Sequence, residues 1–167
     1  NAMTASTEAT YTPSKKGGSG KLSLLQITSS TPDEMNFSGV ESVVTSNWKL
    51  LTVATPGNAD LLSVAKASPT TSRISGTSDG GELTPIAFTG VENVLLHAGR
   101  EYTGVATVAG KIPLVNSLAP YPADQISIQG KVVASGLKNF TINTGAGADA
   151  LFVYGTDFSL PTSGGVF

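Results

Sequence analysis

The chain contains no cysteine and only one histidine, His97, among its 167 residues. The absence of cysteine excludes disulfides, thiolate nucleophiles and cysteine-ligated zinc. A single histidine excludes a site with two imidazole ligands from one chain. Charged residues make up 13% of the sequence, the net charge is −2, and no basic cluster exists beyond Lys15-Lys16. We therefore expect neither a nucleic acid nor an anionic membrane surface as a partner.

Long apolar runs are also missing. No stretch approaches 18 consecutive apolar residues, and no apolar segment follows a basic start, so the sequence predicts neither membrane insertion nor a signal peptide. Asn1-Ala2 before Met3 resembles the remnant of an expression tag, and the polar segment up to Gly20 is rich in Ser and Thr. We expect residues 1–20 to be a tag remnant and a flexible segment, and residues 21–167 to form a single β domain.

Turn formers and small side chains are abundant. The chain has 19 glycines and 9 prolines, but only 7% aromatic residues, and helical periodicity is nearly absent. Short runs rich in Val, Ile, Leu and Thr, separated by turn signals, predict strands instead. The predicted strands cover residues 21–28, 40–45, 50–54, 61–65, 73–76, 91–97, 104–109, 125–129, 138–143 and 150–154.

Two short signatures recur along the chain. The first, [ST]-G-[VL]-[EK]-[SN]-[VF], occurs at residues 38–43, 89–94 and 135–140, with its glycine at Gly39, Gly90 and Gly136. It divides the domain into divergent repeats at 36–86, 87–132 and 133–167. The second, A-D-x-[LI]-x-[VI], occurs at residues 59–64, 123–128 and 148–153.

Stacked repeat units would pair equivalent strands and align their apolar positions into one column. Leu62 and Val64, like Ile126 and Ile128, alternate with polar residues and should face that core. The equivalent polar residues, Ser42, Asn93 and Asn139, are predicted to form a ladder inside a bend. A parallel β-helix or β-solenoid with irregular loops is therefore the expected fold, and an antiparallel β-sandwich is the alternative.

The segments at residues 86–94 and 145–153 resemble degenerate repeats of large secreted or surface proteins of environmental bacteria. In those repeats a "tGvEnl" element leads into a "GGaGnDtf.V" element, and the second element is distantly similar to the RTX nonapeptide of calcium-binding β-rolls. The resemblance implies a β-solenoid segment of an extracellular structural or adhesive protein. The chain departs from the nonapeptide at Thr144, which replaces the first glycine, and at Arg100-Glu101-Tyr102.

No residue constellation predicts catalysis. His97 has no distinguishing neighbours apart from Arg100 and Glu101, which gives no support to a Ser-His-Asp triad. A pair of carboxylates for glycoside hydrolysis would have to come from distant positions. The candidates are Asp60, Glu82, Glu92, Glu101, Asp124 and Asp149. Since three of these aspartates recur at equivalent positions before strands, we expect them to accept main-chain N–H bonds in Asx-turns.

Two further residues, Asp149 and Trp48, are binding candidates. Asp149, with the carbonyls of residues 145–148, is the best calcium candidate, but a single carboxylate is too few for six or more ligands. Trp48 is a candidate anchor for a sugar or a partner chain, and the alternative is a partly buried loop residue.

The sequence thus predicts a non-enzymatic structural or adhesive module of a secreted or cell-surface bacterial protein, with no catalytic, cofactor-binding or metal-binding residues and no cofactor. Its partner is an unidentified protein or glycan, and end-to-end self-association is possible where the solenoid ends are not capped. Residues 21–28 and 158–167 are the expected caps. The alternatives are a polysaccharide-acting β-helix enzyme and a calcium-binding module similar to a β-roll.

Overall fold

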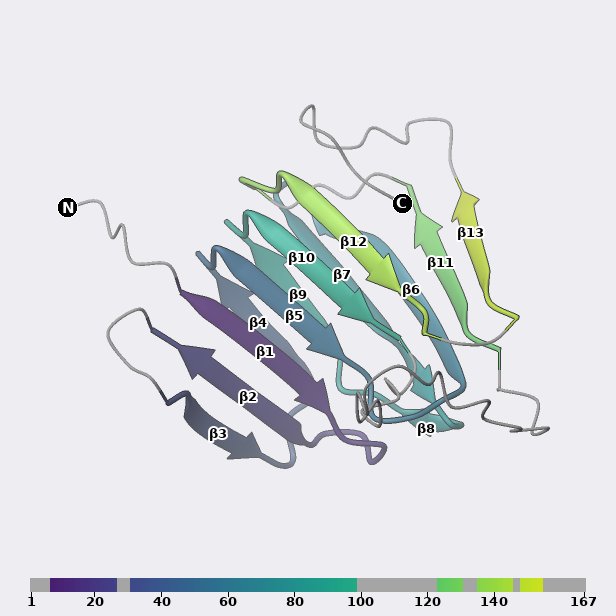
Figure 1. The fold of residues 1–167 in the computed structure, drawn as a ribbon, viewed down its shortest axis with the longest axis horizontal. Helices are drawn as coiled ribbons and strands as arrows, with labels where there is room; N and C mark the ends of the chain where they lie inside the picture. Colours follow the sequence, from purple (N-terminus) through teal and green to yellow (C-terminus); the bar gives the residue numbers. More distant parts are fainter. Residues whose placement is uncertain (1–6, 27–30, 99–122, 131–134, 146–147, 155–167) are drawn as a thin grey trace, which may run out of the picture.

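The computed structural model describes residues 7–26, 31–98, 123–130, 135–145 and 148–154, and every regular element within these ranges is a β-strand. The prediction of an all-β chain is confirmed. The strands form two mixed, open sheets that lie one over the other (Figure 1).

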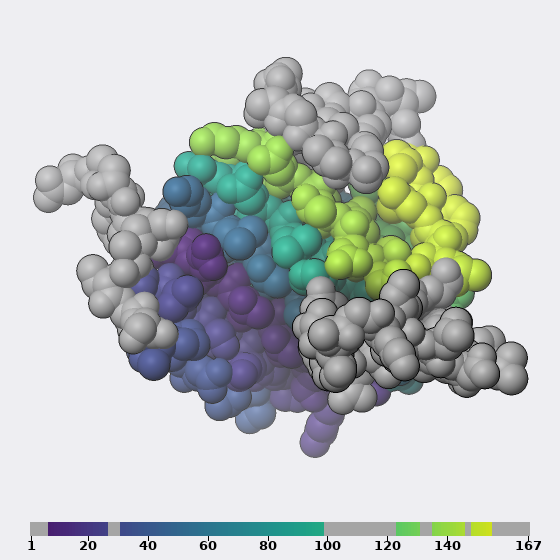
Figure 2. Space-filling model, in the orientation of Figure 1, coloured from purple at the N-terminus to yellow at the C-terminus, as the bar shows by residue number. Residues whose placement is uncertain are grey.

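Each sheet is described by its strands in spatial order. The first sheet consists of β12 (Asn139–Asn143), β10 (Asn93–His97), β5 (Leu50–Ala54), β1 (Glu8–Pro13), β2 (Gly20–Leu25) and β3 (Asp33–Phe37). The second consists of β13 (Ala150–Tyr154), β11 (Gln125–Gln129), β6 (Asp60–Ser68), β7 (Thr71–Ser78), β9 (Ile86–Thr89) and β4 (Val43–Ser46), and β8 (Gly81–Glu82) pairs with β7. In space-filling form the first sheet shows β1, β5, β10 and β12 as successive bands (Figure 2).

One hydrophobic core lies between the two sheets. Alternate residues of each strand point into it, as the period of two in a β-strand requires. Leu62, Val64, Ile126 and Ile128 are all buried, so their predicted place in the core is confirmed. The other fully buried large side chains come from both sheets: Tyr11, Leu51, Val53, Ile86, Phe88, Val91, Val94 and Leu96.

Most strand neighbours within a sheet come from distant parts of the chain and run parallel. In the first sheet β10 lies between β5 and β12, and both pairings are parallel. In the second sheet β11 lies between β6 and β13, again with parallel pairings on both sides. Strands β4 and β9 are also parallel neighbours.

Antiparallel pairing is confined to two places among the described residues. Strands β1, β2 and β3 form a meander at one end of the first sheet. Strand β7 pairs antiparallel with β6 and β9, between which it lies in the second sheet, and with the short strand β8. The chain is therefore a mixture of parallel stacking and local hairpins.

The expectation that residues 1–20 lie outside the fold is wrong for the segment Glu8–Pro13. This segment is β1, which sits between β2 and β5, and its Ala9 and Tyr11 are buried. Its sequence alternates between small polar residues and residues that face the core, which is a strand pattern. The neighbouring Ser/Thr-rich composition masked that alternation.

The expected equivalence of Gly39 with Gly90 and Gly136 is wrong for the first of these glycines. Val43 pairs with Ile86, so Asn47 rather than Gly39 takes the place that corresponds to Gly90. Asn47 has φ 64° and Gly90 has φ 62°, because both turns carry the chain from the second sheet to the first. Asparagine tolerates this left-handed conformation better than other residues with a side chain, so it substitutes for glycine.

The predicted strands agree with the structure to different degrees. Residues 50–54, 125–129 and 150–154 match β5, β11 and β13 from end to end. Strands β1, β3, β8 and β9 were not predicted, and the predicted strand at residues 40–45 begins three residues later, at Val43. The predicted strand at residues 104–109 and the predicted cap at 158–167 lie outside the described residues.

Candidate functional site

The three recurring aspartates lie side by side: Asp60 is the first residue of β6, and Asp124 and Asp149 immediately precede β11 and β13. The register of these strands pairs Leu61 with Gln125, and Gln125 with Ala150, so the aspartates that precede these residues also align. The main-chain N–H of Asp60 donates to Oδ1 of Asp124 at 2.8 Å, and that of Asp124 donates to Oδ1 of Asp149 at 3.0 Å. We name these three residues the aspartate column.

Two carboxylates of the column, those of Asp124 and Asp149, accept main-chain N–H bonds, as the sequence predicts, but not within their own turns. Each acceptor belongs to the neighbouring strand of the sheet. At the first position, the Thr55 hydroxyl also donates to Oδ2 of Asp60 at 2.6 Å. Asp60 and Asp124 are buried, so these bonds offset part of the cost of removing the carboxylates from water.

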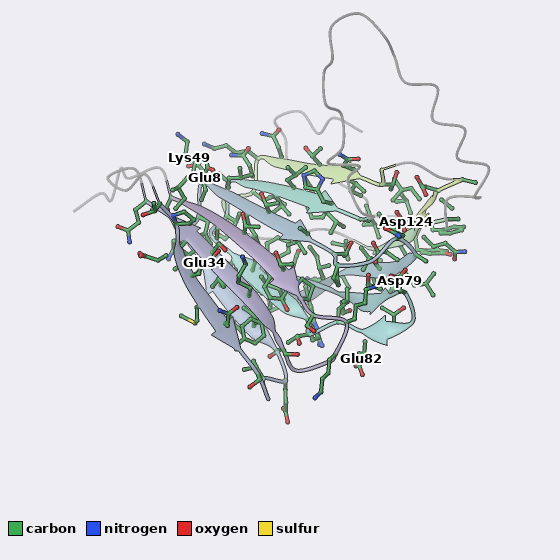
Figure 3. All side chains as sticks on the ribbon, turned by 60° about the horizontal axis from the view of Figure 1, so that its bottom comes forward. Glu8, Glu34, Lys49, Asp79, Glu82 and Asp124 are labelled. Atoms are coloured by element: carbon green, nitrogen blue, oxygen red, sulfur yellow. The ribbon has the colours of Figure 1, made fainter. Side chains whose placement is uncertain are left out.

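The electrostatics of the column single out Asp124. Burial raises the pKa of its carboxyl from the ordinary 3.8 to about 6. The N–H bond from Asp60 lowers this pKa, whereas the negative charges of Asp60, Asp149 and Asp79 raise it. Asp124 and Asp79 lie on the same side of the molecule in Figure 3, far from Glu8 and Lys49.

Asp79 is a fourth carboxylate near this column, and its environment favours the charged form. Its pKa is lowered by a hydrogen bond from the Lys15 ammonium and by bonds from the main-chain N–H groups of Asn58 and Ala59. Within the described ranges, no group of three or more His, Cys, Asp or Glu side chains is placed to hold a metal ion. In the part of the calcium candidate that is described, Oδ1 of Asp149 is engaged by the main chain of Asp124.

A second ladder consists of asparagine side chains. The Asn139 amide donates to Oδ1 of Asn93 at 2.8 Å, and the Asn93 amide donates to the main-chain oxygen of Lys49 at 2.8 Å. The ladder predicted from the sequence therefore forms between Asn93 and Asn139. Its third predicted member, Ser42, is a wrong assignment, because the residue paired with Asn93 is Leu50.

Trp48 is not an exposed anchor. Its side chain is half-buried and packs against the hydrophobic core, and its indole N–H donates to the Thr45 hydroxyl. Of its two interpretations, the structure thus favours the partly buried loop residue.

Residues Gly76–Gly80 match the serine motif G-x-S-x-G. In a nucleophile elbow this serine stands exposed between a strand and a helix. Here Ser78 ends β7, a hairpin turn and β8 follow, and the side chain is fully buried. The motif does not build a nucleophile.

The outer face of the second sheet carries a feature that the sequence did not predict. Leu61, Ser63, Gln125, Ser127, Phe152 and Tyr154, with Leu62 beneath them, line a hollow of about 390 Å³. The rings of Phe152 and Tyr154 are stacked, with centroids 6.3 Å apart and an interplanar angle of 11°. We call this hollow the aromatic trough. The signal available in the sequence was the pair of aromatics at alternate positions of a predicted strand.

Comparison with family models, with curated proteins and with solved structures finds no match to this chain. The described residues contain no helix that could span a membrane.

Proposed function

We propose that this chain is a β-solenoid segment that serves as a non-enzymatic structural or adhesive module of a secreted or cell-surface bacterial protein. One observation carries the proposal: three segments of similar sequence lie next to one another in parallel register, with Asp60, Asp124 and Asp149 aligned. Stacking of this kind is what repeat units require, since each unit buries its apolar face against the next.

The order of the strands supports a solenoid over a sandwich of hairpins. The path β4–β5–β6 and the path β9–β10–β11 each visit the second sheet, the first sheet and the second sheet again. Each strand of the first path has a parallel counterpart in the second path, and β4/β9 and β5/β10 are direct neighbours. Strands β12 and β13 continue the series next to β10 and β11. In this interpretation β7–β8 is an inserted hairpin, and the β1–β3 meander closes one end.

The chemistry of the aligned residues supports a scaffold over an enzyme. Asp60 and Asp124 are the two buried acidic residues in the described part of the chain, and hydrogen bonds from main-chain and hydroxyl donors engage both carboxylates. A catalytic pair of carboxylates must reach a substrate, with one group available to donate a proton and the other to act as base or nucleophile. Acids that hold two strands together in the interior do not meet that requirement.

Location at the cell surface is tested with antibodies raised against the purified chain. The expected result is labelling of intact cells of the source bacterium, or detection in the medium, with a cytoplasmic protein as the control for lysis. Labelling only after the cells are permeabilised would refute the proposed location.

The enzyme alternative is tested by incubating the chain with a panel of polysaccharides and analysing new reducing or unsaturated ends. We expect no product. Product release that Asp124→Asn abolishes would replace the scaffold proposal with a polysaccharide-acting enzyme. The calcium alternative predicts a gain of strand signal by circular dichroism when calcium is added, whereas we expect the same spectrum in calcium and in chelator.

A further inference from the structure

The aromatic trough is built by three adjacent strands whose outward residues fall into register. The first row runs across Leu61, Gln125 and Ala150, and the second across Ser63, Ser127 and Phe152. The third row runs across Ala65, Gln129 and Tyr154. These residues alternate along each strand with core positions, so they belong to the outer face of the sheet.

The hollow exists because the middle of this face carries small side chains. Ser63 and Ser127 form its floor, while Leu61 stands on one side and the rings of Phe152 and Tyr154 on the other. Its volume is about 390 Å³, and it is open to solvent. Larger residues at the two serine positions would fill it.

The aromatic wall is open to solvent. Phe152 and Tyr154 are 41% and 55% exposed, and their rings stand nearly parallel on the same face of β13. Exposed aromatic rings beside a hollow offer a surface on which the apolar face of a ligand can pack. Tyr154 adds a hydroxyl group at the edge of the same surface.

The remaining lining residues are polar but uncharged. Ser63, Gln125 and Ser127 offer hydroxyl and amide groups, and none of the seven lining residues carries a charge. The Ser127 hydroxyl donates to the main-chain oxygen of Leu62 at 3.2 Å, which leaves its oxygen able to accept. The trough therefore combines a flat apolar wall with a floor of neutral hydrogen-bonding groups.

We infer that the aromatic trough binds an uncharged oligosaccharide. A sugar ring has an apolar C–H face that can cover the aromatic wall, and hydroxyl groups around its rim that can bond to the serine and glutamine side chains. The absence of charge in the lining matches a neutral glycan rather than an acidic one. An apolar surface of a second protein would leave the polar floor without partners, which costs free energy. This inference rests on the proposed adhesive role and specifies its partner.

The test uses the full chain and three neutral probes: cellohexaose, maltohexaose and chitohexaose, titrated by calorimetry. We expect at least one of them to bind, and we expect Phe152→Ala and Tyr154→Ala each to weaken that binding by about tenfold. Val153→Ala is the matched control. Val153 lies on the same strand and is 46% exposed, but it points to the opposite face, so its loss should change the affinity less than about twofold.

Three results would overturn the inference. They are the absence of binding to all three probes, binding that the two aromatic variants leave unchanged, and concentration-dependent dimerisation that Phe152→Ala abolishes. Each variant is first checked by chemical denaturation, and Ser127→Leu, which fills the floor and leaves both aromatic residues in the sequence, gives an independent route to the same loss. A lack of oligosaccharide binding would not affect the result of the cell-surface test, so the binding proposal and the proposed function can be refuted independently.

Discussion

The main-chain N–H of Asp60 donates to Oδ1 of Asp124 at 2.8 Å, although 64 positions separate the two residues. The bond joins equivalent positions at the start of β6 and β11, and the main-chain N–H of Asp124 donates in the same way to Oδ1 of Asp149 at 3.0 Å. The aspartates that recur in the sequence thus lie next to one another in space, and Asp124 and Asp149 each accept an N–H bond from the aspartate on the neighbouring strand. These bonds give the recurrence a structural reason.

The aspartate column should make the stability depend on pH. The pKa of Asp124 rises from the ordinary 3.8 in the unfolded chain to about 6 in the folded protein, so the folded state binds the proton more tightly. The contribution of Asp124 to stability is therefore full below pH 4 and is lost as the pH rises to about 6. The expected loss is about 2 to 3 kcal/mol, measured by urea denaturation between pH 4 and pH 7.

Asp124→Asn isolates this effect from the other carboxyl groups. The variant keeps an oxygen that can accept the N–H bond of Asp60 but has no titrating group. We expect its free energy of unfolding, relative to the wild-type chain, to increase with pH over the same interval. A difference between the two proteins that stays constant from pH 4 to pH 7 would show that Asp124 titrates normally.

Two glycines with similar backbone angles should respond differently to alanine. Gly39 and Gly90 both have positive φ, 72° and 62°, so each substitution costs about 1 to 2 kcal/mol of backbone strain. At Gly90 a Cβ atom would also come within 2.5 Å of Oδ1 of Asn47, whereas nothing lies within 4 Å of the same position at Gly39. We expect Gly90→Ala to destabilise the protein more than Gly39→Ala in thermal or urea denaturation. Equal losses would contradict the register that places Gly90 against Asn47.

The strand sequences specify much of this fold, whereas equivalence between distant strands is harder to predict. Strands such as Gln125–Gln129 were predicted from end to end because a buried face alternates with a polar one over their whole length. The aspartate signature identified neighbours correctly because each Asp bonds to the next strand. The glycine signature gave the wrong equivalence at Gly39. The left-handed turn requires a positive φ rather than a particular residue, and Asn47 adopts that angle.

The candidate site was less predictable than the fold. The trough depends on which outward residues of β6, β11 and β13 meet, and a shift of one residue would turn Phe152 to the other face. The sequence indicated Trp48 as the aromatic binding candidate. Its contact with the core results from tertiary packing, which the sequence does not reveal.

The N-terminal strand should be essential for stability. Tyr11 is buried, stacks on Phe37 with centroids 6.1 Å apart, and donates a hydrogen bond to the main-chain oxygen of Thr84 at 2.6 Å. We expect Tyr11→Ala to cost about 3 to 5 kcal/mol, as truncation of a buried aromatic does. Tyr11→Phe should cost about 1 kcal/mol through the lost hydrogen bond. Thr10→Ala, at the outward position next to it, serves as the control, and a loss there as large as for Tyr11→Ala would mean that burial of the ring is not the cause.

The parallel register of β6 and β11 is tested most directly by disulfide trapping, since the chain has no cysteine of its own. Leu61 and Gln125 are paired outward residues of neighbouring strands, and in-register strands lie close enough for a disulfide. Leu61→Cys with Gln125→Cys should therefore form an intramolecular disulfide on mild oxidation, seen by mass spectrometry of the monomer. Leu61→Cys with Gln129→Cys, four residues further along β11, should not. Trapping of the second pair in place of the first would contradict the stacking of the similar segments, and with it the scaffold role proposed for this chain.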